Sequence, residues 1–259
     1  MIKKLVIVLA FAFLAAGGAP AAQFVEREFS CPVCRQVFYA KLDASGARRE
    51  IRLDLKPVGG DGGPWLLPVC PKCGFVIYKT SLKRAELATC KFVVASKDYK
   101  SSLKRSSYFR VGLLYEKLGE KDFSLANTFL KASWQEESDP VNLKEDLERS
   151  LKYFTSCSRS CGDVEKENSR LLMGEILRRL GRFEEARAHL SGLQGLEGFQ
   201  NNFLADIVTY QLKLCSKKDS SAHDMEDVRE SKKPFGARMK NKIRKFFGNL
   251  TGSGQDKAK

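Results

Sequence analysis

The sequence predicts an α+β protein in which a small β module precedes a mainly α-helical domain. Two C-P-x-C motifs lie near the N-terminus, among short β-type runs and turn residues. Apolar residues then recur with helical spacing across residues 103–216. With 259 residues, the chain can form one large or two small domains, each with its own core.

Residues 1–22 have the organisation of a secretory signal peptide. Two lysines precede an unbroken apolar stretch from Leu5 to Ala16, and glycines and an alanine-rich run follow. We expect cleavage after Ala21 or Ala22. The alternative is a retained anchor, which needs about 20 apolar residues. The sequence therefore predicts an exported protein on the periplasmic or extracellular side of the cell envelope.

The predicted β module occupies residues 23–80. Apolar and charged residues alternate from Arg49 to Leu55, a period of two that is typical of a strand. Residues 58–64 are rich in glycine and predict a loop. This strand and loop would form a hairpin insertion between the two cysteine motifs. Residues 81–102 are predicted to connect the module to the helices.

The two cysteine motifs have the spacing of zinc knuckles. Structural zinc takes four thiolates in a tetrahedron, and two C-x-x-C turns supply such a set. Four protein ligands would close the site, so we expect a structural and not a catalytic metal. The sequence therefore predicts a zinc-ribbon-like module with zinc as cofactor, held by Cys31, Cys34, Cys70 and Cys73.

Two details depart from a compact ribbon. Gly74 follows the second motif and can adopt a positive φ, whereas Arg35 stands at the matching position of the first. The motifs are also separated by 35 residues. Disulfides are the default for cysteines in an oxidising compartment, so disulfide bonding of these four residues stays an alternative. A thiol-redox role is another, although the strand–C-x-x-C–helix context of such sites is missing.

Four further cysteines follow the motifs. Cys157 and Cys161 are separated by one helical turn and are candidates for a redox-sensitive disulfide. The alternatives are buried free thiols, or a second set that includes Cys90 and Cys215.

Two segments of the helical domain repeat the same pattern. Gly112 and Gly174 each stand where two helices could cross closely, and a glycine that could end the helix follows seven residues later, at Gly119 and Gly181. The unit from Leu171 to Leu193 has the offsets of a tetratricopeptide-type (TPR) helix pair.

Further helices are predicted around these two units. One is expected from Val141 to Ser156, with Asp139 as its cap and Pro140 at its first position. Another should span residues 201–215. We therefore expect an irregular TPR-like α-solenoid of about six helices across residues 103–216.

No motif indicates an active site. A glycine-rich phosphate loop, a nucleophile elbow and a histidine–carboxylate cluster are not evident from the sequence. His189 is interpreted as a surface residue of a helix, and His223 as part of a polar tail. Four carboxylates are interpreted as solvated helix faces: Glu136, Glu137, Glu184 and Glu185. We therefore expect a protein that is not an enzyme.

Residues 217–259 form a strongly basic tail with an amphipathic helix. Its contact residues are predicted to be Phe235, Met239, Ile243, Phe246, Arg238 and Lys242. The helix could lie on an anionic membrane surface, dock into a groove of the solenoid or a partner, or remain solvated. The formal net charge of +14 favours acidic partners. Nucleic acid is not an expected partner of an exported protein.

The order of these features resembles an uncharacterised bacterial domain family, in which paired CPxC knuckles precede TPR-like helices. The resemblance covers about residues 29–194 and implies a metal-binding module with a helical scaffold, and no reaction. The residues that carry it are Cys31, Pro32, Cys34, Phe38, Val69, Cys70, Pro71, Cys73, Gly74, Gly174, Gly181 and Ala186.

The expected function is that of a non-enzymatic exported scaffold, with a structural zinc-type site and a helical groove for another protein or peptide. The alternatives are a thiol-disulfide redox protein and a peripheral membrane-surface protein held by its basic C-terminal helix.

Overall fold

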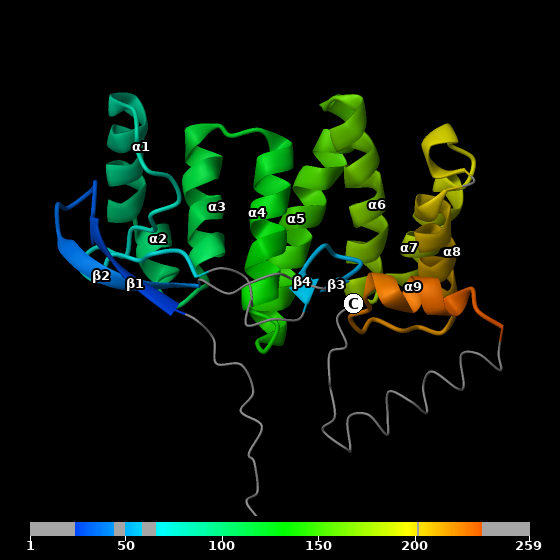
Figure 1. Cartoon of the computed structure of the whole chain (residues 1–259). Coiled ribbons are helices and arrows are strands. Elements are labelled where there is room, and N and C mark those ends of the chain that lie inside the picture. The colour runs from blue at the N-terminus through cyan, green and yellow to red at the C-terminus, as the bar shows by residue number, and fades with distance from the viewer. Residues whose placement is uncertain (1–23, 44–49, 59–65, 201, 235–259) are drawn as a thin grey trace, which may run out of the picture.

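The computed structural model describes residues 24–43, 50–58, 66–200 and 202–234. A row of helices stands side by side, and a β-hairpin lies at its N-terminal end (Figure 1). A second, very short hairpin and a short helix lie along the lower edge of the row. The predicted α+β class is confirmed. No helix within the described ranges is long and apolar enough to cross a membrane.

Within these ranges the chain forms two antiparallel two-stranded sheets and a series of helices. The strands are β1 (Phe24–Ser30), β2 (Val37–Asp43), β3 (Glu50–Ile51) and β4 (Pro57–Val58). The helices are α1 (Arg84–Ala95), α2 (Lys97–Ser101), α3 (Ser107–Leu118), α4 (Asp122–Gln135), α5 (Pro140–Ser160), α6 (Asp163–Arg179), α7 (Phe183–Leu193), the 3-10 helix η1 (Glu197–Phe199), α8 (Phe203–Ser216) and α9 (Met225–Ser231).

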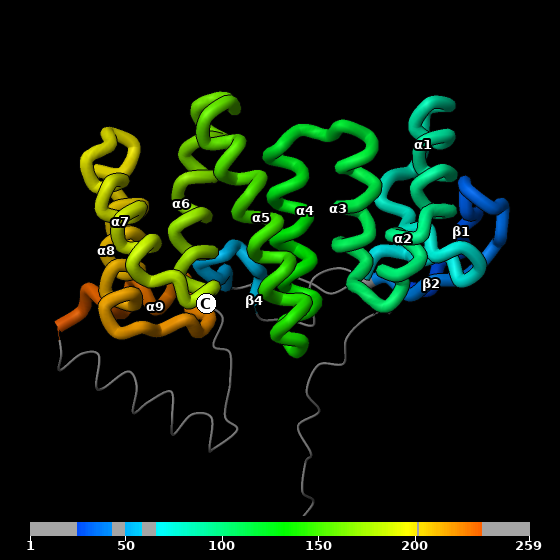
Figure 2. The backbone as a smooth tube through the Cα atoms, turned by 180° about the vertical axis from the view of Figure 1, so that it is seen from behind, coloured from blue at the N-terminus to red at the C-terminus, as the bar shows by residue number. Residues whose placement is uncertain are grey.

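The helices α3 to α8 form where the sequence predicts about six helices. Each packs against the next along the chain, and the view from behind shows the same row (Figure 2). The predicted start of α5 is confirmed, since the Asp139 carboxylate accepts hydrogen bonds from the amides of Val141 and Asn142. Asn202 caps α8 in the same way. These caps satisfy amides that the first helical turn leaves unpaired.

The repeated glycines are positions of close helix crossing. Gly112 of α3 lies against the ring of Phe129 in α4, and Gly174 of α6 lies against Leu190 in α7. Gly119 and Gly181 adopt left-handed φ values of 70° and 73° directly after the helical segments, as predicted. At the two helix crossings glycine is needed because no side chain fits. After the helices it is needed because a residue with a Cβ is strained at a positive φ.

The predicted connector, residues 81–102, is mostly helical. It contains α1 and α2, which pack on the cysteine motifs, and α1 also packs on α3. The buried side of α1 consists of Cys90, Val93 and Val94. The segment looked like a linker because its apolar residues are few, and they contact partners far away in the sequence.

The strand predicted over residues 49–55 is wrong beyond Ile51. The chain turns after β3, and Leu55 adopts a φ of 65°. Leu53 enters the main hydrophobic core of the helical row, whereas Ile51 and Leu55 are exposed. The three residues therefore do not share one face.

The insertion reaches the helical row and does not stay beside the cysteines. The amide of Leu53 donates to the carbonyl of His223 at 2.9 Å. The backbones of Arg52 and Asp224 form an isolated antiparallel β-bridge. The buried carboxylate of Asp54 pairs with Arg52 and with Arg179 of α6, the latter at 3.0 Å. This ion cluster holds the insertion against the C-terminal half of the molecule.

Two of the carboxylates predicted to be solvated instead lie in ion pairs, one of them buried and the other partly exposed. Glu136 is buried and pairs with Arg105 at 2.8 Å. Glu137 pairs with Arg52 and Lys56 of the insertion. The other two, Glu184 and Glu185, are exposed as predicted.

Part of the predicted tail is folded. Residues 217–234 include α9, which packs on α8 and β3 and buries Val228 in the main core. Arg178 is buried and paired with Glu175, and it donates to the carbonyls of Asp219 and Ser221 at 2.6 and 2.9 Å. The predicted amphipathic helix, with Phe235, Arg238, Met239, Lys242, Ile243 and Phe246, lies outside the described residues.

The glycine at a helix crossing gives a signed prediction. In Gly112→Ala, the added Cβ would lie 2.5 Å from Cζ and 2.6 Å from Cε1 of Phe129. Such overpacking should destabilise the protein by about 1–3 kcal/mol. Gly192→Ala in α7 meets nothing within 4 Å and should stabilise by about 0.5–1 kcal/mol. Urea unfolding of both variants is the measurement, and equal effects would contradict the close crossing.

Candidate metal centre

Two similar turns carry the four N-terminal cysteines. Cys31 and Cys34 lie in the turn between β1 and β2, whose last pair is Ser30 and Val37. Cys70 and Cys73 lie in a turn closed by a bridge between Val69 and Val76. The strands thus bring the ends of each turn together.

The two turns share the same backbone hydrogen bonds. The amides of Cys31 and Cys70 each donate at 2.9 Å to the carbonyl five residues later, in Gln36 and Phe75. The amides of Arg35 and Gly74 each donate to the backbone carbonyl of the first cysteine of their turn, at 2.8 and 2.9 Å. The two turns therefore share one pattern of backbone hydrogen bonds as well as the C-P-x-C motif.

Arg35 adopts the conformation expected of glycine. Its φ is 61°, and that of Gly74 is 74°. The difference in sequence between the motifs thus leaves the backbone unchanged, and Arg35 bears the strain of a left-handed residue.

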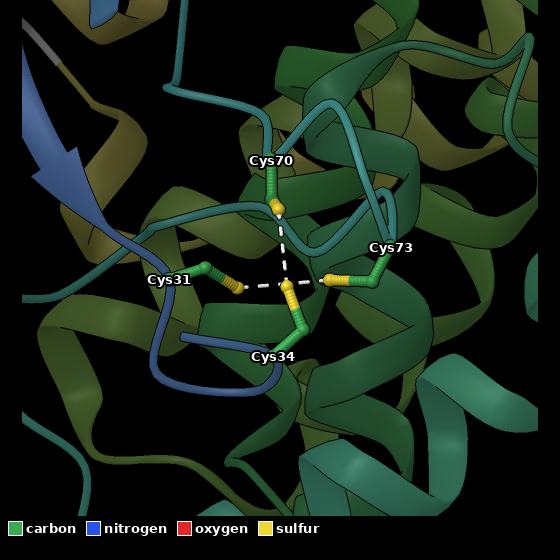
Figure 3. Close-up of side chains that lie close together, drawn as sticks. All are labelled: Cys31, Cys34, Cys70 and Cys73. Atoms are coloured by element: carbon green, nitrogen blue, oxygen red, sulfur yellow. Dashed lines mark hydrogen bonds between the residues drawn. The ribbon is translucent and has the colours of Figure 1, made fainter. Parts of the chain in front are cut away.

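The four sulfur atoms converge on one point (Figure 3). The Sγ atoms of Cys31 and Cys73 are 3.6 Å apart, those of Cys34 and Cys70 are 3.5 Å apart, and all four lie within 4.8 Å of one another. A tetrahedron with Zn–S bonds of 2.3 Å has sulfur–sulfur edges of about 3.8 Å. The distances fit such a site, and they are longer than a disulfide bond of about 2.0 Å.

The tetrad belongs to a hydrophobic core. Cys31 and Cys70 are each 1% exposed, and Cys34 and Cys73 are partly buried. Phe38, Phe75 and Leu114 belong to the same cluster, with α1 on its other side. A metal ion held here would be enclosed by four protein ligands, which is the arrangement of a structural site.

Backbone amides and neighbouring thiols set the acidity of these cysteines. Burial raises the pKa of Cys31, although the amides of Val33 and Cys34 hydrogen-bond to it. For Cys34, the effect of burial is outweighed by the amide of Gln36 and by the other thiols, so its pKa is lowered to about 7. Burial raises the pKa of Cys73. Four thiolates this close repel one another, and a divalent cation would remove that cost.

The remaining cysteines do not form a second tetrad. Cys157 and Cys161 are joined by a disulfide at the end of α5. Cys90 and Cys215 are free and buried, and neither belongs to a group of possible metal ligands within the described residues. Burial raises the pKa of both thiols.

The structure contains a histidine–carboxylate cluster that the sequence analysis missed. His223 lies between Asp219 and Asp227, with nitrogen–oxygen distances of 3.0 and 3.2 Å. Burial opposes ionisation of Asp219, yet Ser221 and His223 lower its pKa to about 2. The i−4 and i+4 spacing of the two aspartates was the available signal. His189 was expected at the surface, but it is partly buried and donates to the carbonyl of Arg170 at 2.6 Å.

Comparisons with protein-family models, curated proteins and solved structures found no match to this chain.

The two left-handed positions should respond oppositely to substitution. Arg35→Gly removes backbone strain and should stabilise the protein by about 1 kcal/mol. Gly74→Ala places a Cβ at a φ of 74° and against Leu103, and should destabilise it by at least that amount. Thermal unfolding of both variants measures the difference. Destabilisation by Arg35→Gly would contradict equal roles for the two positions.

His223 should make stability depend on pH. Its hydrogen bond to Asp227 raises its pKa above 6.5, against the opposing effect of burial. The charged ring therefore stabilises the fold fully below about pH 6.5, and this contribution is lost as the pH rises through the raised pKa. His223→Asn should cost about 1.5 kcal/mol at pH 5.5 and less at pH 9, in urea unfolding. A cost independent of pH would refute the charged form.

Proposed function

We propose that this protein is a non-enzymatic, exported scaffold whose N-terminal module is held together by one structural zinc ion. The observation that carries the proposal is the position of the four sulfurs. They converge at zinc-compatible distances inside a hydrophobic core, where a metal would link both turns to α1 and α3.

The second turn is also tied to the helices by polar contacts. The carbonyl of Gly74 accepts hydrogen bonds from Tyr99 of α2 at 3.1 Å and from Arg110 of α3 at 3.0 Å. Because Gly74 directly follows Cys73, an ion that fixes this turn would also fix the first helices of the row. Zinc would then act as a folding cofactor for the whole N-terminal end.

We assign the helical row a role in binding another protein or peptide. The glycine crossings of α3 with α4 and of α6 with α7 support a TPR-like arrangement. A pocket of about 650 Å³ lies between α1, α2, α3 and α5. Phe92 at its rim is 74% exposed, and the guanidinium of Arg105 stacks on Phe109 at 3.7 Å. Aromatic and arginine side chains of this kind are common anchors in protein interfaces.

A thiol-disulfide function is the second candidate, and the bond between Cys157 and Cys161 is what favours it. Cys157 is fully buried, however, and a reactive cysteine needs access to its substrate. An insulin-reduction assay with the Cys157→Ser and Cys161→Ser variants tests this function. Equal rates for wild type and variants would exclude it.

Zinc removal should unfold the N-terminal end. Protein purified without oxidation should contain about one zinc per chain, by elemental mass spectrometry. Chelation should remove amide protection in β1, β2 and α1 before α8 in hydrogen exchange, because the ion is part of their core. Cys31→Ser should reproduce both effects, whereas Cys215→Ala, a buried cysteine outside the tetrad, should retain zinc. Protein without zinc and with all four thiols oxidised would refute the proposal.

A further inference from the structure

A second pocket lies beside the candidate metal centre, where the turn of Cys70 and Cys73 meets α1, α2 and α3. Its volume is about 760 Å³. Its lining residues include four cations, no carboxylate and two cysteines of the candidate metal centre, Cys70 and Cys73, and apolar side chains make up most of the rest of the wall. The cations are Lys72, Lys91, Lys100 and Arg110.

Arg110 is the unusual member of this set. Its side chain belongs to a residue that is only 6% exposed, and its Nη1 donates to the carbonyl of Gly74. Its Nε has no hydrogen-bond partner, and no carboxylate pairs with it in the part of the chain that the structure describes. Burial lowers its pKa.

The other arginines with little exposure behave differently. Arg178 is fully buried, Arg105 and Arg179 are mostly buried, and all three pair with carboxylates. A buried cation without a counterion is costly, because desolvation is not offset by an opposite charge. Of the two buried arginines in the described ranges, Arg110 is the one that bears this cost, and it lies in the wall of a cationic pocket.

We propose that this pocket binds an organic anion, with a carboxylate or phosphate group that pairs with the cations and an apolar body that contacts Val94 and Leu103. The volume is in the range of small-molecule sites, which are mostly apolar with a few convergent polar groups. A guanidinium suits carboxylate and phosphate oxygens, because its N–H groups can bind two of them at once. The proposal depends on the folded second turn, and in that respect it rests on the proposed zinc site.

A rival explanation is that the cations offset the charge of the metal centre. Zinc with four thiolates carries two negative charges in total, and nearby cations would stabilise it. This explanation accounts for positive charge but not for a cavity with apolar walls. The two explanations differ in what Arg110 affects, which is anion binding in one case and zinc retention in the other.

Calorimetric titration of the full chain tests the proposal. The probes are octyl phosphate below its micelle concentration, octanoate, inorganic phosphate and 1-octanol. We expect one of the two amphiphilic anions to bind at one site per chain, inorganic phosphate to bind more weakly, and octanol not to bind. The comparison of octyl phosphate with octanoate identifies the head group. Affinity should fall with added salt, since the charges at the mouth are exposed.

Variants place the site. The double variant Lys91→Gln, Lys100→Gln should lower the affinity for the anion at least about tenfold. Lys213→Gln, a matched change on the exposed face of α8, should leave its affinity unchanged. Arg110→Gln should abolish binding while zinc content stays the same. If this variant does not fold, the double lysine variant still decides the question, because those side chains are exposed.

Two outcomes would overturn the proposal. They are no binding of either amphiphilic anion to wild type, and equal binding to wild type and the double lysine variant. If the first is accompanied by zinc loss in Arg110→Gln, Arg110 is assigned to the metal centre. Anion binding by a chain that holds no zinc and has all four thiols oxidised would refute the zinc site, and it would show that the second turn forms the pocket without the metal.

Discussion

Four sulfur atoms from two turns, separated by 35 residues of sequence, lie within 4.8 Å of one another, and the N-terminal end of the molecule is arranged around them. The two turns have the same hydrogen bonds and the same left-handed residue at their ends. Each supplies one almost fully buried and one partly buried sulfur. Helix α1 and the second half of α3 complete the core around these sulfurs, so this end of the helical row depends on the turns that it covers.

The chain between the two turns links this end to the rest of the fold. It would have been a free loop if it had stayed beside the cysteines. It instead reaches the lower edge of the helical row, where Leu53 enters the main core and Asp54 pairs with Arg179. The contact also includes His223, so the insertion meets the segment that leads into α9. Residues from the beginning, middle and end of the described chain thus meet at one edge, which opposes separation of the module from the helices.

Buried charge is distributed in two different ways. At the lower edge, the buried Asp54 and Glu175 and the partly exposed Glu137 each pair with arginine, so the cost of burial is largely offset. Beside the metal centre, Arg110 is buried and pairs with no carboxylate of the described ranges. The first pattern is what a structural contact requires. The second leaves a buried positive charge without a counterion, and this charge lies in the wall of the pocket beside the metal centre.

The sequence by itself determined the features that depend on local spacing. The two cysteine turns, the helix ends at Gly119 and Gly181, and the cap at Asp139 each need only a few neighbouring residues, so their patterns were sufficient. Tertiary structure decided the features that depend on distant partners. Contacts between segments far apart in sequence decide the burial of Leu53 and Glu136. They also decide the packing of α1 and the surroundings of His223. The left-handed conformation of Arg35 belongs to the same group, because closure of the turn imposes it against the local preference of the residue.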